Sequence, residues 1–307
     1  MILSICPSPS IDCTMELEQL NVGQLNRVDN KIVTYSGKAL NAAIGVKRLG
    51  GDSYATGFMY NVDGQLFSQR LDNEGVKNTF VWNNGSVRVN YKIVDNRSML
   101  TEINDIGEEV SLDKQKELLD LVTILSKDAS VVIISGSLPK GAPDDYYLQL
   151  SQAVQGNAKK IVDTEGKKLL CALRDGVYMV KPNLRELENV VQNRLTNYDD
   201  MLKASKVLID KGAENVLLSL GRDGAILTDG SNSYFCKSEA IAVNSTVGAG
   251  DSMVAAVAVM TERGANKEEI LRCAVAAGSA SIMTPGTNLF YRDKFEEIYS
   301  KIRVQKL

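Results

Sequence analysis

Short apolar runs that alternate with segments of helical spacing constrain the fold of this 307-residue chain most strongly. The apolar runs of strand length are residues 2–5, 131–134, 160–162, 177–180, 216–219 and 225–228. The segments of helical spacing are residues 39–49, 112–125, 145–154, 184–191, 199–211, 252–263 and 267–283. Nearly all-apolar strands with helices between them are typical of a mostly parallel sheet that is covered on both faces. The pattern therefore predicts an α/β fold with a three-layer α/β/α core.

Two segments do not follow this alternation. Residues 14–35 and 86–105 alternate polar and apolar side chains, as half-buried strands do. We predict that about residues 12–35 and 86–105 form a small β-sheet standing off the main sheet, as a lid or a dimer surface. No linker is long enough to separate two domains, so residues 1–307 are predicted to form a single domain.

Composition excludes several classes of function. A net charge of -3 and a pI near 5.3 argue against nucleic-acid and membrane-surface partners. The chain has no histidine, and its five cysteines form no Cys-x-x-Cys pair, so a zinc or haem site is not expected. No apolar run reaches the roughly 18 residues of a spanning helix, and the N-terminus lacks signal-peptide features. We expect a cytoplasmic protein with buried thiols.

A glycine-bearing loop precedes one predicted helix. Gly248, Ala249, Gly250 and Asp251 lie between an apolar, strand-like run at 239–243 and the helix at 252–263. Glycines allow close backbone approach and a helix start presents unpaired N–H donors, so this geometry suits an anion. Asp251 is then either a helix-start residue or a base beside that anion. Without histidine, acid–base chemistry must fall to Asp, Glu, Lys, Tyr or Cys.

Two common nucleotide motifs are missing. Gly37-Lys38 and Gly166-Lys167 lack the upstream glycine of a Walker A loop. A dinucleotide fingerprint that began at Gly248 would need a third glycine where Met253 stands. Hydride transfer at a dinucleotide site is therefore disfavoured, and the glycine loop serves another chemistry.

Five motifs in order give the chain a resemblance to a known family. They are SGKALNAA at 36–43, SGSLP at 135–139, KPNLRE at 181–186, SLGRDG at 219–224 and TVGAGDSMVA at 246–255. Together they resemble the motifs of the ribokinase-like (PfkB) carbohydrate kinases and cover nearly the whole chain. The resemblance implies a ribokinase-like core with a β-sheet lid.

Three further motifs are similar to one branch of that family. PSID at 9–12, RVNYK at 88–92 and TEIN at 101–104 resemble the branch of 1-phosphofructokinase and tagatose-6-phosphate kinase. The resemblance implies transfer of the γ-phosphate of MgATP to tagatose 6-phosphate or fructose 1-phosphate, giving a ketohexose bisphosphate. The alternatives are 6-phosphofructokinase and a catalytically weak sugar-phosphate or nucleotide sensor on the same fold. A kinase of an unphosphorylated sugar would leave Arg88 and Lys92 without a purpose.

The resemblance also implies roles for individual residues. Asp251 would be the base, beside Gly248, Ala249 and Gly250, which would hold the transferring phosphoryl group. The implied substrate contacts are Asp12, Arg27, Gly37, Lys38, Asn41, Arg88, Asn90, Lys92 and Ser137. The implied ATP contacts are Lys181, Asn183, Ser219, Gly221, Gly224, Thr246, Ala277 and Gly278. Asn183 and Glu186 would position Mg²⁺ through water, some relatives also bind potassium, and some dimerise through the lid.

Local chemistry leaves other interpretations open for several of these residues. Asn183 and Glu186 could be an ordinary acidic first turn after Pro182. Arg88 and Lys92 could be an exposed edge strand, and a hairpin turn would explain Gly221 and Gly224.

The chain also departs from the family motifs, mostly around the sugar. Ser36 and Ala39 replace glycines, Ser8 replaces an asparagine, and Tyr60-Asn61 replaces a Gly-Gly pair. Added Cβ atoms narrow a loop or restrict its backbone. The sequence thus predicts an intact phosphoryl-transfer loop and a shifted sugar pocket.

Overall fold

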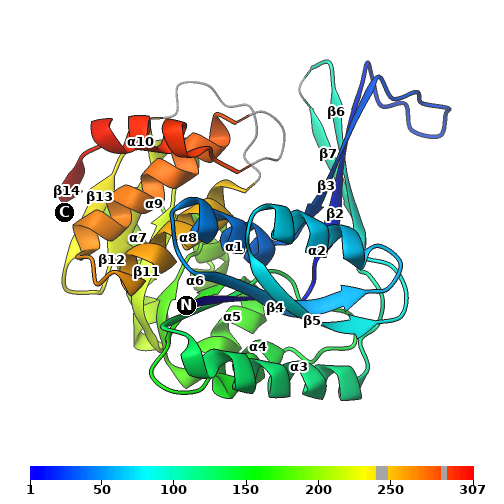
Figure 1. Cartoon of the computed structure of the whole chain (residues 1–307). Helices are drawn as coiled ribbons and strands as arrows, with labels where there is room; N and C mark the ends of the chain where they lie inside the picture. Colours follow the sequence, from blue (N-terminus) through cyan, green and yellow to red (C-terminus); the bar gives the residue numbers. More distant parts are fainter. Residues whose placement is uncertain (98, 240–247, 285–288) are drawn as a thin grey trace.

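The computed structural model describes residues 1–97, 99–239, 248–284 and 289–307, and its main feature is a ten-stranded sheet (Figure 1). Its strands lie in the order β14 (Val304–Lys306), β13 (Ser233–Cys236), β12 (Ala225–Thr228), β11 (Ala213–Ser219), β10 (Val177–Val180), β9 (Lys159–Asp163), β8 (Val131–Ser135), β1 (Ile2–Cys6), β4 (Ser53–Tyr60), β5 (Lys77–Asn83). In that order the strands from β11 to β5 are parallel, whereas β12, β13 and β14 are each antiparallel to their neighbours. The predicted mostly parallel α/β sheet is confirmed.

Helices cover both faces of this sheet (Figure 1). One face carries α1 (Lys38–Arg48), α2 (Gly64–Asn73), α8 (Ala249–Glu262), α9 (Lys267–Ile282) and α10 (Arg292–Lys301). The other carries α3 (Leu112–Leu125), α4 (Tyr146–Ala153), α5 (Gly166–Ala172), α6 (Leu184–Val191) and α7 (Tyr198–Asp210). Successive strand residues point to opposite faces, so Val131 and Ile133 of β8 join one core cluster while Val132 and Ile134 join the other.

A small sheet projects from one side of the core (Figure 1). Its strand order is β3 (Asn30–Ser36), β2 (Ser10–Leu17), β6 (Val89–Asp95) and β7 (Leu100–Asn104). β2 and β6 are parallel, whereas the β2–β3 and β6–β7 pairs are antiparallel. The predicted separate sheet is confirmed, and it begins two residues earlier than its predicted start at residue 12, because Ser10 already pairs with Ser36.

The sequence pattern missed the less regular elements. β4 contains Thr56 and Gly57, which interrupt its apolar run, and β13 and β14 are short and partly exposed. In α2 only Gly64, Phe67 and Leu71 are buried, too few to give a clear helical stripe. The predicted strand-like run at 239–243 lies, apart from Glu239, outside the described residues. No helix within the described ranges is both long and apolar enough to cross a membrane.

Candidate functional site

A cavity of about 1350 Å³ lies where the parallel strands end and the small sheet begins. Ser137, Asp163, Lys181 and Ser219 line it from the carboxyl ends of β8, β9, β10 and β11. Ligands of open α/β sheets bind at this edge. The predicted site residues that line the cavity are Asp12, Gly37, Lys38, Asn41, Arg88, Asn90, Lys92, Ser137, Lys181, Asn183, Glu186, Ser219, Gly221, Gly224, Gly248, Ala249, Gly250, Asp251 and Gly278.

Three predicted site residues are not among those lining residues. Arg27 lies exposed in the connection between β2 and β3. Ala277 belongs to α9 and is buried within the hydrophobic core. Thr246 lies outside the described residues.

The start of α8 forms the floor of the cavity. Gly248 precedes the helix in the left-handed conformation, with φ of 80°, which glycine adopts readily. The first N–H groups of a helix have no partner within it, and among the described residues no side chain caps this one. A Cβ on Gly250 would stand 3.2 Å from Nζ of Lys181, so the glycine keeps open the space between that lysine and the helix start. Unpaired N–H donors beside an ammonium group fit a phosphate.

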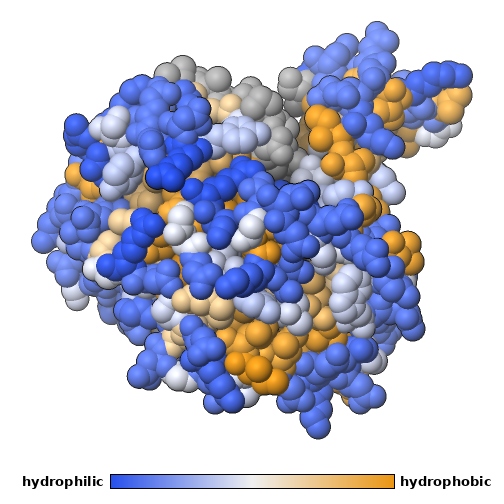
Figure 2. Space-filling model, viewed as in Figure 1, coloured by the Kyte–Doolittle hydropathy of each residue, from blue (hydrophilic) through white to orange (hydrophobic). Residues whose placement is uncertain are grey.

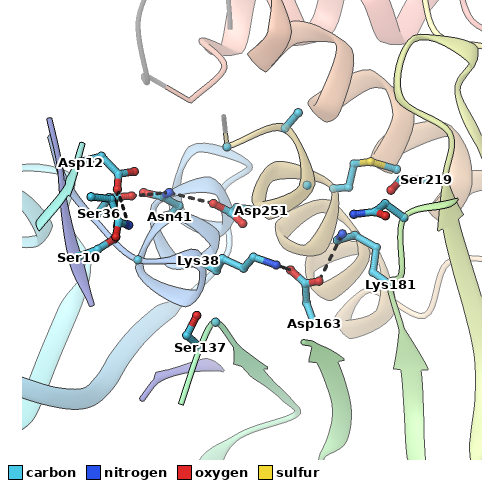
Figure 3. A pocket seen from close by; sticks show the side chains of 18 of the residues that line it. Ser10, Asp12, Ser36, Lys38, Asn41, Ser137, Asp163, Lys181, Ser219 and Asp251 are labelled. Atoms are coloured by element: carbon cyan, nitrogen blue, oxygen red, sulfur yellow. Dashed lines mark hydrogen bonds and ion pairs between the residues drawn. The ribbon is translucent and has the colours of Figure 1, made fainter. Parts of the chain in front are cut away.

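Asp251 lies in the first turn of α8 and is only 7% exposed. Its Oδ2 accepts a hydrogen bond from Nδ2 of Asn41 at 2.8 Å (Figure 3). Burial raises the pKa of Asp251 to about 6, although the Lys38 charge and the Asn41 bond both act to lower it. The carboxyl group can therefore hold or release a proton near neutral pH.

Asp163 is a site residue that the sequence interpretation missed. It ends β9, is 1% exposed, and stands between two lysines: Nζ of Lys181 is 3.3 Å from Oδ1 and Nζ of Lys38 is 3.5 Å from Oδ2 (Figure 3). Burial alone would raise the pKa of Asp163, but Lys181 and Lys38 hold it below its ordinary value. The same contact raises the pKa of Lys38. An acid directly after the apolar run at 160–162 was the signal that could have found it.

Polar side chains of the small sheet line the opposite end of the cavity. The carboxylate of Asp12 accepts a hydrogen bond from Nζ of Lys92 on Oδ2, at 3.2 Å, and one from Nδ2 of Asn90 on Oδ1, at 3.1 Å. Arg88 donates to Oδ1 of Asn90 and to Oγ of Ser8, both at 2.9 Å. Within the described residues, no carboxylate oxygen lies within 4.0 Å of the Arg88 guanidinium. The charge of Lys92 is thus balanced by Asp12, whereas that of Arg88 is left facing the cavity.

Asn183 and Glu186 cap α6 and line the cavity at once. The side chain of each accepts a hydrogen bond from the backbone N–H of the other, at 2.9 Å in both cases. Within the described residues there is no group of three acidic, histidine or cysteine side chains placed to hold a metal ion. Mg²⁺ takes few protein ligands and keeps its waters, so one carboxylate at the cavity wall fits an indirect magnesium contact.

The remaining wall combines glycines and apolar side chains. Gly221 and Gly224 flank the turn between β11 and β12. A Cβ on Gly224 would lie 2.0 Å from the carbonyl oxygen of Cys236, so the hairpin itself requires that glycine. Met253, Val275, Gly278 and Ile282 line the cavity nearby. A flat apolar group, such as a nucleobase, fits this wall.

Two of the departures from the family motifs make contacts of their own. Ser36 Oγ accepts a hydrogen bond from Nδ2 of Asn41 at 3.1 Å. Ser8 Oγ accepts from Nε of Arg88 at 2.9 Å. Both serines therefore orient polar side chains that face the cavity.

Known proteins resemble this chain over its whole length. The family model described as pfkB family carbohydrate kinase matches residues 7–294. A 1-phosphofructokinase of Borreliella burgdorferi is 30% identical, over 100% of this chain and 99% of its own. A tagatose-6-phosphate kinase of Staphylococcus epidermidis is 32% identical, over 99% of each. The structure of phosphofructokinase-2 from Escherichia coli in complex with potassium matches with a TM-score of 0.89 and 31% identity, over 97% of this chain and 98% of its own. The chain belongs to the pfkB family of carbohydrate kinases.

Proposed function

We propose that this protein transfers the γ-phosphate of MgATP to a ketohexose monophosphate, tagatose 6-phosphate or fructose 1-phosphate. One observation carries the proposal: a single cavity joins a buried carboxylate at a glycine-bearing helix start to Arg88, which no carboxylate balances in the part of the chain that the structure describes. The first end suits a phosphoryl group in transfer, and the second suits the phosphate already on the sugar. The names of the relatives point to the same substrate class.

Asp251 is proposed as the base that takes the proton of the attacking sugar hydroxyl. A pKa of about 6 leaves most of its carboxyl ionised at neutral pH, yet close enough in basicity to accept a proton. The backbone N–H groups of Gly248, Ala249 and Gly250 would hold the transferring phosphoryl group. One such donor is worth about 2.7–4 kcal/mol in a transition state.

The nucleotide is proposed to lie along the wall formed by β10, β11, α8 and α9. Lys181, Asn183 and Ser219 would meet its phosphates, while Gly221, Gly224 and Gly278 leave room for the nucleoside. Asn183 and Glu186 would hold Mg²⁺ through water, and the ion would neutralise charge on the phosphates. Thr246 and Ala277 as ATP contacts, and a potassium ion near the catalytic loop, stay predictions.

The sugar is proposed to lie between the small sheet and α1. Asp12, Asn41 and Asn90 offer the acceptors and donors that hydroxyl groups need. Gly37, Lys38 and Ser137 border the same space, and Arg88 would bind the existing phosphate. Lys92 would act by orienting Asp12, and Arg27 as a phosphate contact stays a prediction.

The small sheet is proposed to serve both as a lid, within one domain spanning residues 1–307, and as a dimer surface. The cross-strand row Thr34, Asp12, Asn90 and Asn104 alternates with the row Val33, Cys13, Tyr91 and Ile103. The first row supplies cavity residues, so the second faces away from the cavity.

Apolar surface on that second row supports the dimer. Val33, Tyr91 and Ile103 are exposed, and Figure 2 shows apolar surface on this sheet. A sedimentation experiment that finds a monomer would exclude the dimer, and an Ile103→Lys variant should dissociate it.

The five cysteines are free thiols, which fits a cytoplasmic setting.

An ADP-release assay tests the proposed reaction. Fructose 1-phosphate, tagatose 6-phosphate, fructose 6-phosphate and the free sugars are compared, with an ATP-only reaction as the blank. Turnover is expected with one of the first two. Preference for fructose 6-phosphate would identify the protein as a 6-phosphofructokinase. If no compound in the set led to ADP release, the protein would be a sensor.

A further inference from the structure

The side-chain amide of Asn41 has polar groups on both of its sides. Its Nδ2 donates to Oδ2 of Asp251 at 2.8 Å and to Oγ of Ser36 at 3.1 Å. Its Oδ1 faces Nη1 of Arg70 at 3.5 Å. Asn41 is 3% exposed, so water has little access to hydrogen-bond with its side-chain amide. The orientation of this amide therefore depends on the protein groups around it.

Arg70 is a half-buried cation that no described carboxylate contacts within 4.0 Å. It comes from α2 and, within the described residues, makes no ion pair. Its Nη1 donates to the carbonyl oxygen of Tyr35, next to Ser36 at the end of β3. Phe67 of the same helix packs edge-on against Tyr35, with ring centroids 5.3 Å apart. Burial lowers the pKa of Arg70, although the negative charges of Glu74 and Asp12 act to raise it. Burying this cation therefore costs free energy that its hydrogen bonds to neutral oxygens offset only in part.

We propose that Arg70 is a positioning residue, which fixes the Asn41 amide so that its NH₂ group faces the carboxylate of Asp251. A reversed amide would place Oδ1 against that carboxylate and the NH₂ group against the guanidinium. Both contacts would be repulsive, so the cation favours the observed orientation. The inference rests on the proposed role of Asp251 as the base.

Other charged groups also act on Asp251, and Arg70 is separate from them. Lys38 faces it from α1, while Asp163 and Lys181 act from the ends of β9 and β10. The Asn41 bond lowers the pKa of Asp251 because it stabilises the ionised form. Loss of Arg70 should weaken only that bond. The pKa of the base should then rise, and activity should fall on the acid side of the pH profile.

The test is the pH dependence of kcat/KM for Arg70→Met, which is similar in length and uncharged. The acidic limb should move to higher pH by about one unit, so activity below the midpoint falls about tenfold while activity near pH 8 changes little. Arg70→Lys keeps a cation and should recover part of that shift. If Arg70→Met does not fold, Arg70→Gln, which keeps a donor for the Tyr35 carbonyl, is measured in its place.

Two further variants separate positioning from a structural role. Arg48 is also a partly buried arginine near α2, and it donates to the carbonyl oxygens of Leu289 and Phe290. Arg48→Met should lower thermal stability and leave the acidic limb in place. Asn41→Ala should shift the limb by itself, and adding Arg70→Met to it should cause no further shift, because both changes remove one interaction.

Two results would overturn the inference: an unmoved acidic limb in folded Arg70→Met, or an equal shift in the Asn41→Ala background. Failure of the proposed function looks different. If Asp251→Asn kept both wild-type turnover and the acidic limb, the base assignment itself would be wrong. If Asp251→Asn lost turnover while Arg70→Met left the limb unmoved, only the role of Arg70 would be wrong.

Discussion

The two ends of the cavity handle positive charge in different ways. At the end beside α8, Lys38 and Lys181 share the buried carboxylate of Asp163, at the edge of the main sheet. At the end beside the small sheet, Lys92 is paired with Asp12 but Arg88 contacts neutral oxygens. The first end is therefore held together before any ligand binds, and the second keeps one cation for a ligand. Changes at the first end should affect rate and folding, and changes at the second should affect substrate choice.

The largest effect is expected from Asp251→Asn at the α8 end. The asparagine cannot accept the proton, so kcat should fall by about 10²–10⁴-fold, the usual contribution of a general base. ATP affinity should stay close to that of the wild type, because the N–H donors and Lys181 remain. Steady-state kinetics and calorimetric ATP titration measure the two quantities. Wild-type kcat in this variant would remove the base assignment.

Asp163→Asn should show how far the α8 end depends on its shared carboxylate. The change leaves Lys181, which is 6% exposed, without its counter-charge. Removing one partner of a buried ion pair typically costs about 3–5 kcal/mol of unfolding free energy, and urea denaturation measures it. Asp210→Asn removes the exposed pair with Lys206 and should cost at most about 1 kcal/mol. Equal losses in the two variants would contradict a special role for Asp163.

Arg88→Met should separate the two ends by substrate. A charge-assisted hydrogen bond contributes about 1.5–3 kcal/mol, so KM for the sugar phosphate should rise by about ten- to a hundredfold. KM for ATP and the turnover of an unphosphorylated sugar should barely change. Lys92→Met should act differently, since it leaves Asp12 buried without its cation and should weaken both kinds of sugar. If Arg88→Met weakened both kinds equally, the phosphate would bind elsewhere.

The sequence predicted the parts of the fold that repeat one simple pattern. The predicted helices at 112–125 and 184–191 match α3 and α6 residue for residue, because apolar and polar positions alternate there at helical spacing. α2 and β4 were missed because few buried side chains or an internal glycine weaken their patterns. The glycine loop before α8 was identifiable because glycines and an acid at a helix start form a local signal.

Contacts between distant segments were beyond the sequence. Asn41 and Asp251 are 210 residues apart, and nothing near either one indicates their hydrogen bond. Arg70 resembles any charged residue on a short helix until its surroundings are known. Lys92 likewise suggested a phosphate contact, and only the pairing of β2 with β6 brings Asp12 against it. Periodicity shows which face a residue occupies, whereas its partner depends on tertiary packing.

The smallest expected effect is a change in the free energy of unfolding of Asp251→Asn, at the α8 end of the cavity. The pKa of Asp251 is raised to about 6 in the folded protein from the ordinary 3.8, so the folded state holds this proton more tightly than the unfolded chain. Its contribution to stability is then greatest below the lower value and is lost as pH rises toward the upper one. Asp251→Asn removes that loss. At about pH 8 its free energy of unfolding should therefore exceed that of the wild type by on the order of 1–3 kcal/mol, which urea denaturation measures.

The pH dependence of that difference is the stricter test. Toward about pH 4 the wild-type carboxyl is protonated when folded, so the two proteins should approach equal stability. Asp210→Asn, at an exposed position, should show no comparable trend. A wild type more stable than Asp251→Asn at about pH 8 would mean that Lys38 and Asn41 outweigh the burial of the carboxylate. Asp251 would then be held ionised like Asp163, and the two ends of the cavity would differ only in their cations.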